Sequence, residues 1–178
     1  MKSAPDVGDL LTRIRWTLGF FMAALVVSGL TAFPLQWELD LLARWLGAGD
    51  MALPSQYTGL LYWIVTVRNG LRATYAAYPF IAYGTDWLAF AHIVLAVFIV
   101  GAWRDPVRNI WVVQAAMVAC VLVVPLALIC GPVRGIPVYW RLIDCSFGLL
   151  GFVPLWLVHR WAGKLSALPQ KTIDGGTR

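Results

Sequence analysis

The sequence predicts an all-α integral membrane protein: an antiparallel bundle of four transmembrane helices, with two short amphipathic helices on the outer face between spans 1 and 2. Four apolar stretches are long enough to cross a bilayer, whose hydrocarbon core of about 30 Å needs roughly 20 helical residues. The chain of 178 residues is 60% hydrophobic, only 13% charged and contains ten tryptophans. A water-soluble domain does not have that composition, so the bilayer is the expected solvent.

The boundaries of the spans follow from where charged residues interrupt the apolar runs, and from the tryptophan and tyrosine residues that favour the headgroup level at their ends. The two connections within the second half of the chain are short, which allows only antiparallel neighbours. We predict tails at 1–15 and 162–178, spans at 16–35, 83–103, 110–130 and 139–161, an amphipathic region at 36–82, and loops at 104–109 and 131–138.

The positive charges predict the orientation, because lysine and arginine near span ends are retained in the cytoplasm. With both termini inside, nine of the fourteen lie on the cytoplasmic side: Lys2, Arg13, Arg15, Arg104, Arg108, Arg160, Lys164, Lys171 and Arg178. We therefore expect a protein of a bacterial-type inner membrane with both termini cytoplasmic. The net charge of +5 is dispersed over the span ends, which argues against nucleic acid as a partner.

The region 36–82 shows helical periodicity with one apolar face. Trp37, Leu41 and Trp45 share a face in its first part, and Leu60 and Ile64 begin a second such pattern. The apolar core of this second pattern is less than half a span long, so a fifth crossing is not expected. The region is predicted to fold as two amphipathic helices that cap the outer mouth of the bundle.

The fourth span contains an acidic residue, Asp144, and an ionisable group inside a membrane is costly enough to indicate a purpose. Gly148 and Gly151 follow on the same helix face, and small residues mark the face where helices approach closely. Arg141 stands three residues before Asp144, and Arg134 lies in the preceding loop. Two interpretations remain open: an ion pair that locks the hairpin, or a polar site for an anionic or polar ligand.

The second span adds Asp86 and, deeper, His92. Asp86 alone fits a first-turn acid that is favoured by the helix dipole, and His92 alone fits a hydrogen bond to a neighbouring helix. If spans two and four are neighbours, these residues converge with those of the fourth span beneath the cap. The candidate ligand site then comprises Asp86, His92, Arg134, Arg141 and Asp144, with Arg68, Arg72 and Tyr78 closing its mouth.

No cofactor is favoured. His92 and His159 lie at opposite depths, roughly 20 Å apart along the membrane normal, so one chain cannot hold a haem between them. A single-ligand haem or pigment at His92 remains an alternative. Gln114, at the inner end of the third span, is expected to form an interhelical hydrogen bond.

The three cysteines lack the spacing of a metal site, and no metal is expected. Cys130 and Cys145 both face the oxidising side in the predicted topology. Free thiols that act as small apolar fillers are the favoured interpretation, and a disulfide between these two residues is the alternative.

The sequence contains no nucleotide-binding glycine-rich loop, no nucleophile and base pattern and no metalloprotease motif. Two function classes remain. The first is a non-catalytic binding or accessory subunit of a membrane complex, found with a larger membrane protein or as a homo-oligomer. The second is a membrane-embedded enzyme or carrier for a small polar or anionic molecule, acting through Asp86, His92, Arg141 and Asp144.

Overall fold

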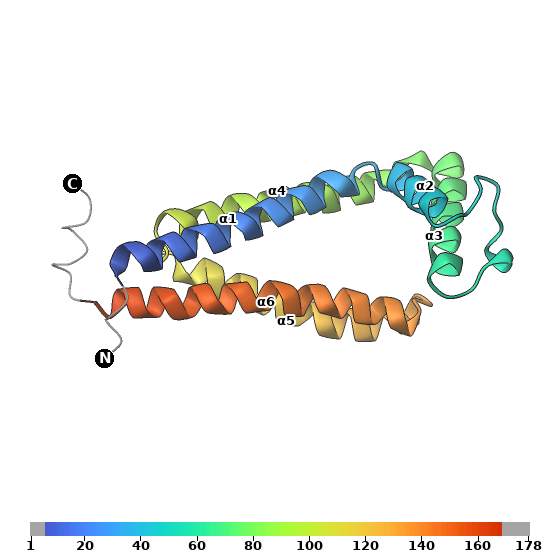
Figure 1. Ribbon diagram of the computed structural model, residues 1–178. Coiled ribbons are helices and arrows are strands. Elements are labelled where there is room, and N and C mark those ends of the chain that lie inside the picture. Colours follow the sequence, from blue (N-terminus) through green and yellow to red (C-terminus); the bar gives the residue numbers. More distant parts are fainter. Residues whose placement is uncertain (1–5, 169–178) are drawn as a thin grey trace. The chain divides into compact units, whose positions relative to one another are not determined.

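The computed structural model describes residues 6–168, and every regular element within them is a helix (Figure 1). Four helices are long and apolar enough to cross a membrane: α1 (Val7–Ala32), α4 (Ala82–Arg104), α5 (Ile110–Val133) and α6 (Val138–Ser166). The prediction of an all-helical chain with four such helices is confirmed. These helices fit a membrane-embedded protein.

The helices extend beyond the predicted spans. α1 begins at Val7 and α6 continues to Ser166, so both reach into the segments that were predicted to be terminal tails. The predicted spans ended at charged residues, but arginine and lysine are good helix formers and do not stop a helix. The remaining parts of the predicted tails, 1–5 and 169–178, lie outside the described residues.

Large apolar side chains cover the outside of the four long helices. Phe20, Ile129 and Leu150, for example, are 75%, 66% and 68% exposed. Such a surface suits lipid, in which apolar side chains gain nothing by turning inward. Helix contacts in that solvent depend instead on small residues and on hydrogen bonds between helices.

The chain divides into two compact units. Unit 1 comprises Met1–Ala24 and Leu95–Arg178, and unit 2 comprises Leu25–Val94. The helices α1 and α4 therefore each contribute one part to either unit.

In unit 1, α5 and α6 form an antiparallel hairpin. Gln114 of α5 contacts His159 of α6. Farther along α5, Cys120 meets Gly148, where a Cβ atom would lie 2.5 Å from the carbonyl oxygen of Cys120. As residue numbers rise along α5, the numbers of the α6 residues that they contact fall, so the two helices run antiparallel. The glycines at 148 and 151 allow the close approach that their spacing predicted.

Unit 1 also includes the N-terminal part of α1 and the C-terminal part of α4. The indole Nε1 of Trp103 donates to the carbonyl oxygen of Arg15 at 3.1 Å, and the Arg15 guanidinium lies 5.9 Å from the centroid of the same ring. An aromatic residue at a helix end thus ties two long helices of this unit together.

Unit 2 contains two further helices, α2 (Leu35–Trp45) and α3 (Gly59–Ala77), with 3₁₀ turns at Pro54–Gln56 and Pro79–Ile81. Figure 1 shows α3 running across the direction of the α1 and α4 segments of this unit. Its small core lies between α2, the following loop and α3, and comprises Ala43, Ala48, Ala52, Ile64 and Val65. α3 is 19 residues long, which is longer than a short helix.

Candidate functional site

Arg68 of α3 is the one charged side chain that is fully buried among the described residues, at 0% exposure. Its guanidinium Nη1 donates to the carbonyl oxygen of Gly49 at 3.1 Å and its Nη2 to that of Ala52 at 3.5 Å. Its Nε donates to Asn69 Oδ1 at 3.1 Å. A buried charge is tolerable when its donors are satisfied, so Arg68 holds the loop between α2 and α3 against α3.

Arg72, one turn farther along α3, extends this network to α2. Its Nη2 forms an ion pair with Asp40 Oδ1 at 2.5 Å, and its Nη1 donates to the carbonyl oxygen of Asp50 at 2.8 Å. The sequence pattern predicted Arg68 and Arg72 at the mouth of a ligand site. The structure places both guanidinium groups in contacts inside unit 2, while Tyr78, at the end of α3, packs edge-on against Phe80.

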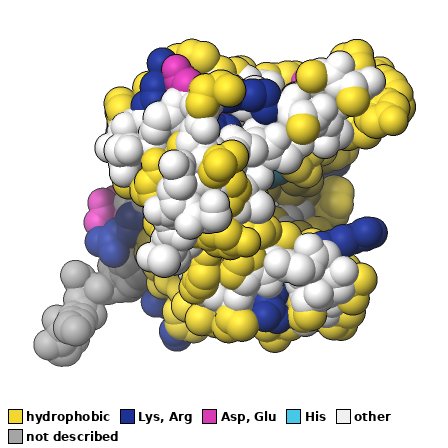
Figure 2. Space-filling view, turned by 90° about the vertical axis from the view of Figure 1, so that its right-hand side faces the viewer, with side chains coloured by type: hydrophobic (Ala, Val, Ile, Leu, Met, Phe, Trp, Pro, Cys, Tyr) yellow, Lys and Arg dark blue, Asp and Glu magenta, His cyan; other side chains and the backbone are white. Residues whose placement is uncertain are grey.

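Arg68 and Arg72 of α3 make contacts within unit 2. By contrast, large apolar side chains of α2 and of the loop that follows it are exposed. Trp37, Trp45 and Met51 are 59%, 79% and 90% exposed, and Leu46 and Leu53 are also exposed. We name these five residues the cap surface. In Figure 2, which views the end that carries α2 and α3, this part of the molecule is a mosaic of hydrophobic, basic and polar atoms.

Asp86 and His92 both lie on α4 in unit 2. Asp86 is beyond the first turn of this helix, so it is not the first-turn acid considered from the sequence. The Nδ1 of His92 lies 2.8 Å from the carbonyl oxygen of Leu88 in its own helix, and not against a neighbouring helix as the sequence suggested. Since a carbonyl can only accept, Nδ1 donates in this contact, and Nε2 is the ring nitrogen that remains for another partner.

α4 packs closely against α1 beside His92. A Cβ atom on Gly29 of α1 would lie 2.7 Å from the carbonyl oxygen of Ala89 and 3.2 Å from the Cβ of His92. The absence of a side chain at Gly29 therefore lets α1 and α4 approach at the level of the imidazole. If a single-ligand haem or pigment bound to this chain, the Nε2 of His92 would be the ligand atom.

Arg134, Arg141 and Asp144 lie in unit 1, at and beyond the connection between α5 and α6. Arg141 and Asp144 form no ion pair, and Arg72 with Asp40 is the pair present in the described part of the chain. The Arg141 stem instead packs against Gly131 of α5, where a Cβ atom would overlap its Cγ and Cδ atoms. The ion pair considered from the sequence is thus not formed, because the stem crosses to the neighbouring helix.

The eight residues of the predicted ligand site therefore fall into two sets. Arg68, Arg72, Tyr78, Asp86 and His92 belong to unit 2, and the other three belong to unit 1. Their convergence into one site would join the two units and stays a prediction.

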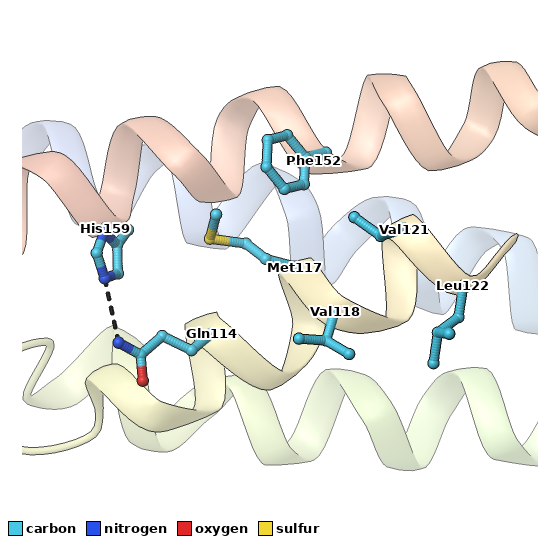
Figure 3. A pocket seen from close by; sticks show the side chains of 7 residues that line it. All are labelled: Gln114, Met117, Val118, Val121, Leu122, Phe152 and His159. Atoms are coloured by element: carbon cyan, nitrogen blue, oxygen red, sulfur yellow. Dashed lines mark hydrogen bonds between the residues drawn. The ribbon is translucent and has the colours of Figure 1, made fainter. Parts of the chain in front are cut away.

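A groove between α5 and α6 in unit 1 was not foreseen from the sequence (Figure 3). It has a volume of about 340 Å³ and walls formed by Met117, Val118, Val121, Leu122 and Phe152. At one end, Gln114 Nε2 lies 3.2 Å from His159 Nε2. The amide donates, so the imidazole Nε2 accepts. This bond confirms the interhelical role predicted for Gln114 and identifies His159 as its partner.

Replacing Gln114 with leucine should weaken the α5–α6 hairpin modestly. Hydrogen bonds between membrane helices contribute about 0.6 kcal/mol on average and up to about 1.7 kcal/mol. We expect a decrease of that size in the free energy of unfolding in detergent, and His159→Leu should show the same decrease. If the double variant lost the sum of the two single losses, the two side chains would not be coupled.

Cys120, Cys130 and Cys145 are free thiols, so the disulfide considered for Cys130 and Cys145 is not formed. Residues 6–168 contain no group of three or more histidine, cysteine or acidic side chains arranged to hold a metal ion. The chain matches no family model, no curated protein and no solved structure.

Proposed function

We propose that this protein is a non-catalytic binding or accessory subunit of a membrane complex, and that its cap surface contacts a protein partner. One observation carries the proposal. The segment between α1 and α4 uses the charged groups of Arg68, Arg72 and Asp40 for internal contacts, while it exposes Trp37, Trp45 and Met51. Exposed aromatic and methionine side chains on a rigid support are typical of protein interfaces.

Attraction to charged lipid does not account for this segment. Residues 33–81 contain three acidic and three basic side chains, so the segment carries no net charge that would draw it to anionic headgroups. Arg68 and Arg72 are held by carbonyl oxygens and Asp40. The apolar residues of the cap surface are left as its main binding feature.

The proposed partner can be detected by native mass spectrometry of the protein extracted in mild detergent. The double variant Trp45→Ser/Met51→Ser should lose the associated mass, because it removes two exposed apolar anchors. Trp111→Ser, which alters an exposed tryptophan of unit 1, is the matched control and should keep it. A partner of the same mass as the chain would indicate a homo-oligomer. Monomeric wild-type protein in every mild detergent would contradict the proposal.

The proposed arrangement in the membrane is an antiparallel four-helix bundle in a bacterial-type inner membrane, with α2 and α3 on its outer face and both termini cytoplasmic. The distribution of lysine and arginine over the loops supports it. The short connections between α4 and α5 and between α5 and α6 support antiparallel neighbours.

Reporter fusions test this topology. A reporter placed after Arg178 or within 104–109 should report the cytoplasm, and one near Asp50 should report the periplasm, because basic residues concentrate on the side of the termini. A cytoplasmic signal from the Asp50 fusion would reverse the orientation of α2 and α3.

The alternative function is a membrane-embedded enzyme or carrier for a small polar or anionic molecule, acting through Asp86, His92, Arg141 and Asp144. The observation that favours it is the orientation of His92, whose Nδ1 contact leaves Nε2 for another partner. Asp86→Asn and His92→Gln should then abolish the cellular function at unchanged protein abundance. Full complementation of a deletion strain by both variants would exclude this alternative.

A further inference from the structure

The side chain of Arg141 is held in place by packing at the end of the α5–α6 hairpin. Its Cγ and Cδ atoms fill the space that a side chain on Gly131 would take, and Gly131 itself is buried. The stem is thus fixed by α5, although the residue belongs to the first turn of α6. A long side chain that is held in one place is prepared to bind, because less rotamer entropy is lost on binding.

One N–H donor of the Arg141 guanidinium has no hydrogen-bond acceptor within the described part of the chain. Its Nε atom is buried and has no hydrogen-bond acceptor among the described residues. Neither Arg141 nor Arg134 forms an ion pair within that part of the chain, although Asp144 is only three residues away. A buried donor without an acceptor costs about 1–3 kcal/mol, and because Arg141 as a whole is only partly buried, the remaining donors of its guanidinium are left to meet an acceptor from outside the chain.

The charges at this end of the hairpin favour an anion. Arg134 follows α5 directly as its C-terminal cap residue, and Pro137 stands at the start of α6 and provides no side-chain cap. The N-terminal end of α6 adds the positive end of a helix dipole. The C-terminal end of α5 lies at the same connection with the negative end of its own dipole, so the positive balance comes from two arginines against the single carboxylate of Asp144.

We propose that Arg134 and Arg141 bind a phosphoryl group at the end of the α5–α6 hairpin. The planar guanidinium fork matches the oxygen spacing of a phosphate and can donate two parallel hydrogen bonds to it. The hairpin connects two helices that are long enough to span a membrane, so its end meets the level at which lipid phosphates lie. Free inorganic phosphate carries the same oxygens, so it is the second candidate source of the phosphoryl group.

The test uses the full chain purified in a phosphate-free detergent. Native mass spectrometry measures retention of dioleoyl phosphatidylglycerol, and of dioleoylglycerol, which has the same acyl chains without a phosphate. Arg141→Gln should retain the phospholipid at least about tenfold less, since charge-assisted bonds are lost. Arg134→Gln should reduce retention in the same direction. Arg108→Gln, in the loop between α4 and α5, is the matched control and should behave as wild type.

Gly131→Ala tests the position separately from the charge. It keeps both arginines but places a Cβ atom where the Arg141 stem lies, so a folded, monodisperse variant should also lose the phospholipid. Full retention by that variant would overturn the site. A second result would also overturn it: wild type and Arg141→Gln retain the phospholipid equally, and inorganic phosphate changes the Tm of neither.

Inorganic phosphate distinguishes the source of the phosphoryl group. If phosphate alone raises the Tm of wild type in lipid-free detergent and leaves that of Arg141→Gln unchanged, the site takes the free anion. If only the phospholipid shows dependence on Arg141, the site takes a lipid headgroup. Retention of dioleoylglycerol should not depend on Arg141, and a dependence as large as that of the phospholipid would overturn the proposal.

Discussion

Replacing Arg68 with methionine is expected to destabilise the folded segment 33–81 by about 2–4 kcal/mol, since the carbonyl oxygens of Gly49 and Ala52 lose buried donors at roughly 1–3 kcal/mol each. Ala52 keeps the hydrogen bond from Asn69 at 2.9 Å, which limits its share of the loss. Amide hydrogen exchange in residues 46–57 measures the change directly, because this loop is held to α3 by the affected contacts.

Arg44→Met is the matched control for Arg68→Met. Arg44 is exposed at the end of α2, and its only described side-chain hydrogen bond goes to the carbonyl oxygen of Asp40 at 3.3 Å. Its replacement should be close to neutral. Equal exchange rates in the two variants would show that the Arg68 network does not hold the loop.

Gly148→Val should produce the largest loss in unit 1. The Cβ position at Gly148 is 2.5 Å from the carbonyl oxygen of Cys120, and backbone cannot move aside as a flexible side chain can. α5 and α6 must therefore separate, at a cost of about 1–3 kcal/mol or more for the branched side chain. The unfolding free energy in mixed detergent micelles measures the loss.

Gly163→Ala provides a control of opposite sign. Gly163 lies in the same helix, α6, and no atom stands within 4 Å of its Cβ position. Alanine should stabilise the helix there by about 0.5–1 kcal/mol, because glycine is the weaker helix former. If Gly148→Val were no more destabilising than Gly163→Ala, the close approach of α5 and α6 would be refuted.

The fold class could be predicted because it depends on long apolar runs, which are visible in the sequence. The packing face of α6 was also visible, since Gly148 and Gly151 stand at helical spacing and both face Cys120 of α5. The helix ends were less predictable, as the start of α1 at Val7 shows. Charged residues mark where a membrane ends, and a helix can continue past that level.

The positions of the site residues depend on contacts that the sequence does not show. Arg68 is buried because the acceptors are main-chain carbonyls of Gly49 and Ala52, and residue type says nothing about where a carbonyl points. The spacing of Arg141 and Asp144 suggested an ion pair, but the space at Gly131 directs the arginine to α5. Main-chain acceptors and empty space beside a glycine were decisive, and neither has a sequence pattern.

The pairing of Gln114 with His159 was missed for a related reason. The sequence indicated an interhelical hydrogen bond for Gln114, yet its partner follows from the register of α5 against α6. That register is set by the contact of Cys120 with Gly148. Gly148 and Gly151 marked the packing face of α6 in the sequence, but they did not say which residue of α5 lies opposite.

Site-specific photocrosslinking in intact membranes tests the central claim, that the cap surface binds a protein. A photoreactive phenylalanine analogue at position 45 replaces an exposed tryptophan of the cap surface, and the same analogue at position 150 replaces Leu150, which is exposed on α6. We expect a discrete protein adduct from position 45 and lipid adducts alone from position 150. Lipid adducts alone from both positions would contradict a binding subunit and would assign the cap surface to the membrane interface.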